Sequence, residues 1–192
     1  KSLLRHPDFV KELNAEALKP YMTFQYPAIG ETFFKGVYKL PEGHYFTYRD
    51  GKMDIHRYYD EDFREGKQKL GELVNSIDQT VCDSVKAHQI ADVEVGSFLS
   101  SGVDSSYVAA VARPQHTYSI GFGKGTYNES QQAGELAELL KLNNTAESLT
   151  DEEAFAAFPR IQWHLDEPDS NPSCVPLYFL SALAAKDVKV VL

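Results

Sequence analysis

The segment that decides the fold is Phe98–Ser106, which reads F-L-S-S-G-V-D-S-S. An apolar run, Val93–Leu99, ends in Ser100–Gly102, and a helix-prone stretch, Asp104–Ala112, follows. Strand, tight turn and helix in this order present backbone N–H groups and a helix N-terminus to an anion. We therefore predict a phosphate-binding loop at Ser100–Gly102, where small side chains let the backbone approach phosphate oxygens.

The residue types within this turn suggest separate roles. Gly102 can adopt a positive φ, and Ser105 and Ser106 can cap the helix or donate their hydroxyls. Asp104 would repel a phosphate unless a cation lay between them, so it indicates a bound Mg²⁺. The alternative interpretation is an ordinary strand-to-helix turn with Ser105 as N-cap.

The loop differs from two common phosphate-binding motifs. It has no G-x-x-x-x-G-K-[ST] pattern, no lysine after the turn and no G-x-G-x-x-G. It does resemble the S-G-G-x-D-S pyrophosphate loop of enzymes that use ATP to adenylylate a carboxylate or a carbonyl. Ser101 stands where that pattern has its first glycine.

Composition limits the function classes. The chain has 192 residues, enough for one large domain or one domain and part of another. Its net charge of −9 argues against a nucleic-acid-binding surface. No apolar run approaches the ~20 residues that span a bilayer, and the first residues show no signal-peptide pattern. Cys82 and Cys174 lack C-x-x-C partners, so we expect small buried or half-buried apolar residues, with a disulfide left open. We expect a cytoplasmic protein.

Residues 1–59 predict antiparallel β structure. His44–Arg49 and Lys52–Arg57 flank Asp50-Gly51, a strong hairpin signal. A short helix is expected over residues 14–19, with Asn14 as N-cap and Pro20 as its stop. The many aromatic residues are expected to pack in the core and across strands.

After residue 60 the pattern changes to helices and strands. A first long helix is expected over residues 61–88, with a buried stripe comprising Leu70, Leu73, Val74, Ile77, Val81 and Val85. We place a domain boundary near Tyr59–Asp62, giving domains 1–59 and 60–192. The expected strands are Val93–Leu99, His116–Phe122, Thr145–Leu149 and Val188–Leu192. The expected helices are Asp104–Ala112, Asn128–Leu142, a helix opened by the capping box Thr150–Glu153, and Pro176–Ala185. A loop is expected at Gly123–Thr126.

This alternation predicts an α/β fold, a mainly parallel sheet with helices on both faces. Ligands of such sheets bind at the carboxyl ends of the strands, where Leu99 and Phe122 lie. Because the sequence stops within an apolar strand, we expect a fragment of a longer protein.

The chain resembles glutamine-hydrolysing asparagine synthetase over nearly its whole length. The similarity lies in Leu99–Ser106, Tyr118–Phe122, Tyr127–Glu129, His164–Pro168 and Asn171–Ser173. Lys189–Leu192 resembles the strand that precedes the family's S-G-E-G-A-D-E motif. Residues 1–59 resemble the end of the family's glutaminase domain, whose nucleophile, an amino-terminal cysteine, would lie upstream.

The resemblance implies a PP-loop ATP pyrophosphatase-like fold and a two-step reaction. ATP and Mg²⁺ activate aspartate as an aspartyl-adenylate with release of pyrophosphate, and ammonia from glutamine then gives asparagine and AMP. The implied ATP-binding residues are Leu99, Ser100, Ser101, Gly102, Val103, Asp104, Ser105 and Ile120, with Asp104 as metal ligand and no catalytic side chain assigned. Leu99 and Ile120 would hold adenine between them, and plain strand core is an equal alternative for both.

The resemblance also implies substrate-side residues, Asp166, Glu167, Asn171 and Ser173. Glu167 is better explained by a solvated turn, His164 by a structural role, Trp163 by packing in the core, and Asn128 and Glu129 by capping. The implied partners are aspartate, glutamine and ammonia, with no nucleic acid and no membrane. A homodimer is left open.

Three rival functions are a β-lactam synthetase-like cyclase, a sulfur-inserting tRNA enzyme, which the acidic charge opposes, and a non-catalytic nucleotide-binding fragment. We expect no asparagine synthesis from these 192 residues alone. Unpaired sheet edges in residues 1–59 also predict strand swapping or disorder there.

Overall fold

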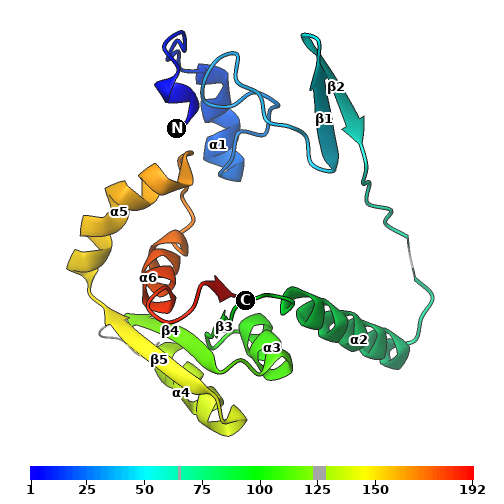
Figure 1. The fold of residues 1–192 in the computed structure, drawn as a ribbon, viewed down its shortest axis with the longest axis vertical. Coiled ribbons are helices and arrows are strands. Elements are labelled where there is room, and N and C mark those ends of the chain that lie inside the picture. Colours follow the sequence, from blue (N-terminus) through cyan, green and yellow to red (C-terminus); the bar gives the residue numbers. More distant parts are fainter. Residues whose placement is uncertain (65, 123–128) are drawn as a thin grey trace. The chain divides into compact units, whose positions relative to one another are not determined.

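The computed structural model describes residues 1–64, 66–122 and 129–192 (Figure 1). They form two compact units, Lys1–Lys67 with Gln162–Asn171, and Gln68–Ile161 with Pro172–Leu192. Among the described helices, none is long and apolar enough to cross a membrane. The domain boundary near Tyr59–Asp62 stays a prediction.

The second unit is built on a parallel sheet. Its strands are β3 (Val95–Phe98), β4 (His116–Phe122), β5 (Asn143–Leu149) and β6 (Val190–Val191), in the order β5-β4-β3-β6. Every neighbouring pair in this sheet is parallel. The predicted parallel sheet is confirmed, although β3 and β6 are shorter than the apolar runs that contain them.

Helices cover both faces of this sheet. On one face the core contains Leu99 with residues of α3 (Val103–Ala112) and α4 (Glu129–Leu140). On the other face Tyr118 packs with residues of α6 (Cys174–Ala184). Figure 1 shows α4 and α6 on opposite sides of the sheet. Successive strand residues point to opposite faces, so Phe98 and Leu99 contribute to different halves of the core.

The strand order creates a topological switch point beside β3. The chain moves outward from β3 to β4 and β5, then returns to the other side of β3 as β6. Open α/β sheets bind ligands in the crevice at such a reversal, outside the carboxyl ends of the strands. The segment Ser100–Gly102 leaves the carboxyl end of β3, and therefore lies at this position.

In the first unit the predicted hairpin is confirmed. β1 (His44–Arg49) and β2 (Lys52–Arg57) pair antiparallel, from His44 opposite Arg57 to Arg49 opposite Lys52. Asp50 and Gly51 have φ values of 52° and 78°, as the tight turn of a two-residue hairpin requires.

The predicted stop at Pro20 is wrong. After η1 (Leu3–Arg5) and η2 (Ala15–Ala17), helix α1 runs over Leu18–Phe24 and contains Pro20 in its first turn. Backbone N–H groups of a first turn have no intrahelical acceptor, so proline costs little there. Asn14 does act as a cap, because its Oδ1 accepts a hydrogen bond from the Glu16 N–H at 3.2 Å.

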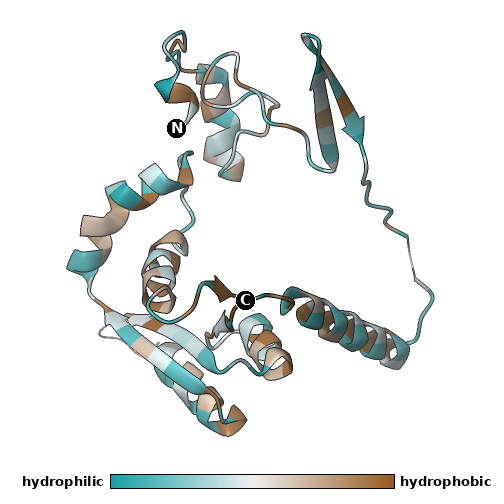
Figure 2. Cartoon of the chain, viewed as in Figure 1, coloured by the Kyte–Doolittle hydropathy of each residue, from teal (hydrophilic) through white to brown (hydrophobic). Residues whose placement is uncertain are grey.

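Most aromatic side chains of the first unit are exposed, contrary to the expected packing in a core. Tyr45 does stack across the strands on His56, with ring centroids 5.2 Å apart. Figure 2 shows hydrophobic and hydrophilic residues mixed along the hairpin. Tyr38, Tyr48 and Tyr58 are 71%, 69% and 70% exposed, whereas Phe33 is buried. A two-stranded hairpin has no second layer against which to bury its side chains. Trp163, expected in the core, is also exposed, with Lys1 Nζ 5.8 Å from its ring centroid.

Helix α2 (Leu70–His88) differs from its prediction at both its start and its buried face. It begins at Leu70 rather than residue 61, because the preceding segment carries charges and Gly66 but no apolar stripe. Leu70 and Ile77 are exposed, and Val85 is the buried position of the helix. The half-buried Val81 and Cys82 and the buried Val85 lie in the C-terminal half of α2, and Gln89 Nε2, just after the helix, donates to Ala112 O at 2.7 Å. Near the middle of α2 the Tyr107 hydroxyl donates to the Asp78 carboxylate.

The remaining helices follow their predictions approximately. Helix α4 ends at Leu140 rather than Leu142, and α6 begins at Cys174, with Pro176 in its first turn. The predicted loop Gly123–Thr126 and the N-cap Asn128 lie outside the described residues.

The predicted capping box opens α5 (Asp151–Leu165). Thr150 N–H donates to Glu153 Oε2 at 2.9 Å, and Glu153 N–H donates to Thr150 Oγ1 at 3.2 Å. The hydrogen bonds from the Thr150 backbone and hydroxyl lower the pKa of the Glu153 carboxyl below its ordinary 4.5.

The capping box makes the start of α5 sensitive to acid. Because the folded pKa of Glu153 is lowered, its stabilisation of α5 is present above about pH 4.5 and is lost as pH falls through the folded pKa. We expect an NMR carboxyl titration to give a pKa below 4.5 for Glu153, and Thr150→Val to move it part of the way back. A titration midpoint at or above 4.5 would contradict the box.

Candidate functional site

The loop between β3 and α3 turns without a left-handed residue. Gly102 is the N-cap of α3, with φ −72° and ψ 148°, so the expected positive φ is wrong. Glycine is favoured there for space, because an added Cβ would lie 3.2 Å from Ser100 Oγ.

Two of the three loop N–H groups that were expected to face phosphate donate hydrogen bonds to serine hydroxyls instead. Ser100 N–H donates to Ser105 Oγ at 3.2 Å, and Gly102 N–H donates to Ser100 Oγ at 3.1 Å. The two hydroxyl oxygens lie 2.7 Å apart. A phosphate that used these amides would take the place of the serine oxygens. The N-cap of α3 is Gly102, and the Ser105 hydroxyl accepts a hydrogen bond from the loop. The alternative interpretation, in which Ser105 is the N-cap, is therefore wrong on that point.

The first turn of α3 supplies further donors. The first intrahelical bond runs from Ser106 N–H to Gly102 O at 3.1 Å. The N–H groups of Val103, Asp104 and Ser105 precede that bond and have no acceptor within the helix. Such groups, with the positive end of the helix dipole, favour an anion.

Asp104 provides a carboxylate beside these donors. It lies exposed in the first turn of α3, and no described basic side chain forms an ion pair with it. Mg²⁺ is commonly held by one or two carboxylates together with substrate phosphates. Among the described residues no three His, Cys, Asp or Glu side chains form a metal cluster. The site thus fits Mg²⁺ only if the nucleotide supplies further oxygens.

The two residues expected at adenine differ in their burial. Leu99 is 2% exposed and packs with Ala109, Ala133 and Ala137, which favours the core alternative. Ile120, on β4, is half-buried and keeps accessible surface. An adenine contact stays a prediction for both.

The substrate-side candidates Asp166 and Glu167 are held in ion pairs of the first unit. Lys1 Nζ lies 2.9 Å from Asp166 Oδ1, and this hydrogen bond lowers the pKa of the Asp166 carboxyl. Lys39 Nζ lies 2.7 Å from Glu167 Oε2. Both pairs are partly exposed, which supports the solvated-turn interpretation of Glu167.

The other predicted positions are also located. Asn171 N–H donates to Asp169 Oδ1 at 2.9 Å, and Ser173 is the N-cap of α6. Cys82 and Cys174 are half-buried, within the expected range, and no disulfide joins them in the part of the chain that the structure describes.

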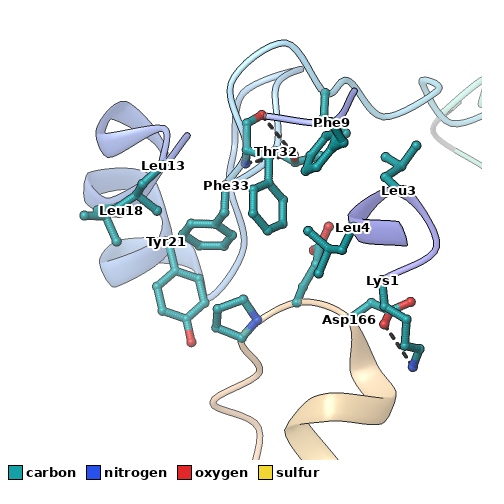
Figure 3. Close-up of a pocket in the computed structure, with 14 residues that line it drawn as sticks. Lys1, Leu3, Leu4, Phe9, Leu13, Leu18, Tyr21, Thr32, Phe33 and Asp166 are labelled. Atoms are coloured by element: carbon teal, nitrogen blue, oxygen red, sulfur yellow. Dashed lines mark hydrogen bonds and ion pairs between the residues drawn. The ribbon is translucent and has the colours of Figure 1, made fainter. Parts of the chain in front are cut away.

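Sequence reasoning missed an apolar pocket in the first unit (Figure 3). Its volume is about 430 Å³, and its lining includes Phe9, Tyr21, Phe33 and Pro168. Tyr21 and Phe33 meet edge to face with ring centroids 5.3 Å apart. The lining comes from separate stretches of the chain, so no local motif could have indicated it.

The parallel sheet and its strand order define an α/β protein whose loop and helix amides lie at the position where sheets of this kind bind ligands. Residues 76–192 match the family described as asparagine synthase, and residues 1–59 match the glutamine amidotransferase domain family. The chain belongs to the asparagine synthase family. The resemblance seen in the sequence is therefore confirmed.

Comparison with two curated relatives shows what share of their length this chain covers. The chain is 37% identical to asparagine synthetase [glutamine-hydrolyzing] 1 of Bacillus subtilis, over 94% of this chain and 29% of the relative. It is 35% identical to a putative asparagine synthetase [glutamine-hydrolyzing] of Mycobacterium bovis, over 96% of this chain and 30% of the relative. The chain thus spans less than a third of the length of these relatives.

A solved structure with limited similarity is the NH3-dependent NAD synthetase from Campylobacter jejuni. The TM-score is 0.40 and the sequence identity 16%, covering 61% of this chain and 54% of that chain.

Proposed function

We propose that the full-length protein converts aspartate to asparagine, using ATP and ammonia released from glutamine. The observation that carries this proposal is the loop Ser100–Ser105 at the switch point, with open helix amides beside the exposed Asp104. The two family matches support the same reaction. In this proposal residues 1–59 end the glutaminase domain and residues 60–192 begin the synthetase domain.

In the first step a side-chain carboxylate oxygen of aspartate attacks the α-phosphorus of ATP. The bond from that phosphorus to the bridging oxygen breaks, and pyrophosphate leaves from the aspartyl-adenylate. The amides of Ser101 and Val103–Ser105 would bind the β- and γ-phosphates and stabilise the charge that develops on the leaving group. Mg²⁺, held by Asp104, would supply positive charge at the same phosphates.

In the second step the ammonia nitrogen attacks the acyl carbon and AMP leaves with the oxygen that joined them. The nitrogen loses a proton, which gives the amide of asparagine. We assign no side chain of this sequence to that proton transfer. Ile120 would border adenine, and Asp166, Glu167, Asn171 and Ser173 are the candidates for the aspartate side.

An isotope experiment with the full-length protein tests this order of steps. Aspartate labelled with ¹⁸O in its side-chain carboxylate is turned over with ATP and glutamine, and the nucleotide product is analysed by mass spectrometry. We expect AMP that carries one ¹⁸O from each aspartate. Label in inorganic phosphate together with ADP would contradict the adenylate. Absence of AMP formation with aspartate would instead favour a cyclase or a non-catalytic nucleotide-binding protein.

A further inference from the structure

A buried polar relay runs from β5 to the start of the phosphate loop. Ser119, on β4, is 1% exposed, and its Oγ lies 2.8 Å from Leu99 O. The side-chain amide of Asn144, on β5, lies 3.0 Å from Ser119 Oγ. The same amide lies 3.1 Å from the buried Thr117 Oγ1, which is 3.0 Å from Asn143 O. The proposed reaction steps use none of these side chains directly.

The Ser119 bond lies where the chain leaves the sheet. Leu99 N–H donates to Tyr118 O at 2.8 Å and continues the ladder from β3 to β4. In a longer parallel ladder the next donor to Leu99 O would be the Ile120 amide. Here the Ser119 hydroxyl donates a hydrogen bond to Leu99 O, and the backbone then continues into the loop Ser100–Gly102. This hydroxyl therefore fixes the residue from which the loop departs.

The number of hydrogens on each side chain indicates which group donates and which accepts in the relay. A hydroxyl has one hydrogen, so Ser119 cannot donate to Leu99 O and to Asn144 at once. In the structure Asn144 Oδ1 faces both hydroxyls, and the nitrogen and oxygen of a side-chain amide are assigned from hydrogen counts of this kind. With the amide turned over, the two hydrogens of Nδ2 would reach Ser119 Oγ and Thr117 Oγ1. Each hydroxyl then gives its own hydrogen to a carbonyl, Leu99 O or Asn143 O. With Oδ1 in that place, the three oxygens Leu99 O, Asn143 O and Asn144 Oδ1 would compete for two hydroxyl hydrogens, so one oxygen would receive none from these hydroxyls.

We propose that Ser119, oriented by Asn144, is a positioning residue for the diphosphate of ATP. This inference rests on the proposed function, because it assigns the loop to the β- and γ-phosphates. Ser119 touches no substrate, and it acts by holding Leu99 O. Loss of the hydroxyl lets the loop amides shift relative to the phosphates, and small displacements of binding groups reduce rates strongly.

The test compares two buried hydroxyls of one strand in the full-length protein. Ser119→Ala removes the hydroxyl that reaches the loop, and Thr117→Val removes one that reaches only β5. In aspartate-dependent exchange of pyrophosphate into ATP, we expect Ser119→Ala to raise the KM for ATP about tenfold. The KM for aspartate should stay within about twofold in both variants. Equal KM values for ATP in the two variants would overturn the proposal.

Asn144→Asp provides a second route if Ser119→Ala does not fold. A carboxylate accepts and has no hydrogen to give, so it would draw the Ser119 hydrogen away from Leu99 O. We expect the same increase in the KM for ATP, with Ser119 intact, and an unchanged KM would overturn the role of Asn144. Failure of the relay is distinguishable from failure of the proposed function. Absence of aspartate-dependent AMP formation by the full-length protein rejects the function, whereas normal KM values for ATP in Ser119→Ala and Asn144→Asp reject only the relay.

Discussion

Asp104→Ala is expected to lower aspartate-dependent exchange of labelled pyrophosphate into ATP by about 10²-fold or more in the full-length protein. The carboxylate is exposed in the first turn of α3, beside the open amides of Val103 and Ser105. Without it, Mg²⁺ would be held by the nucleotide alone, and the charge on the leaving pyrophosphate would be less well stabilised. Raising the Mg²⁺ concentration should restore part of the rate.

Two control variants separate this role from a general effect of charge. Asp104→Asn keeps the size of the side chain and loses its charge, so it should lose exchange almost as Asp104→Ala does. Asp151 is also an exposed acid in the first turn of a helix, α5, and Asp151→Ala should leave exchange unchanged. Exchange at the parental rate and with the parental Mg²⁺ dependence in Asp104→Ala would reject the metal site.

Leu99→Ala is expected to destabilise the second unit by about 2–5 kcal/mol, the usual cost of truncating a buried leucine. Leu99 is 2% exposed and touches α3 and α4 through Ala109, Ala133 and Ala137, which are too small to fill the space left by truncation. The measurement is the opening free energy of the slowest-exchanging amides of β4, obtained by hydrogen exchange of the full-length protein.

Ile120→Ala is the matched control for Leu99. Ile120 is only half-buried, so its truncation should cost less stability and raise the KM for ATP if the side chain borders adenine. A Leu99→Ala variant of parental stability with a raised KM for ATP would instead make Leu99 an adenine contact. That result would contradict the assignment of Leu99 to the core.

Local signals in the sequence predicted the local structure well. Asp50-Gly51 places the hairpin turn at the observed residues, because both positions need a positive φ. Thr150 and Glu153 marked the start of α5 through the reciprocal bonds of a capping box. Small residues after an apolar run identified the loop at Ser100–Gly102 for the same kind of reason, since steric demands act over a few residues.

Features that depend on distant parts of the chain were not predicted. The return of β6 to the far side of β3, which creates the switch point, has no local sequence signal. The amphipathic pattern of α2 showed which face is apolar, but the pattern says nothing of whether a partner covers Leu70 and Ile77. The bond from Ser119 to Leu99 O joins two strands and was likewise invisible in the sequence.

The most direct test of the loop assignment is a crystal structure of the full-length protein with Mg²⁺ and an ATP analogue that cannot release pyrophosphate. We expect the β- and γ-phosphate oxygens to accept hydrogen bonds from the amides of Ser101 and Val103–Ser105, with Mg²⁺ bound to the Asp104 carboxylate. Phosphates bound elsewhere on the protein, with no hydrogen bond from the amides of Ser101 and Val103–Ser105, would contradict the account.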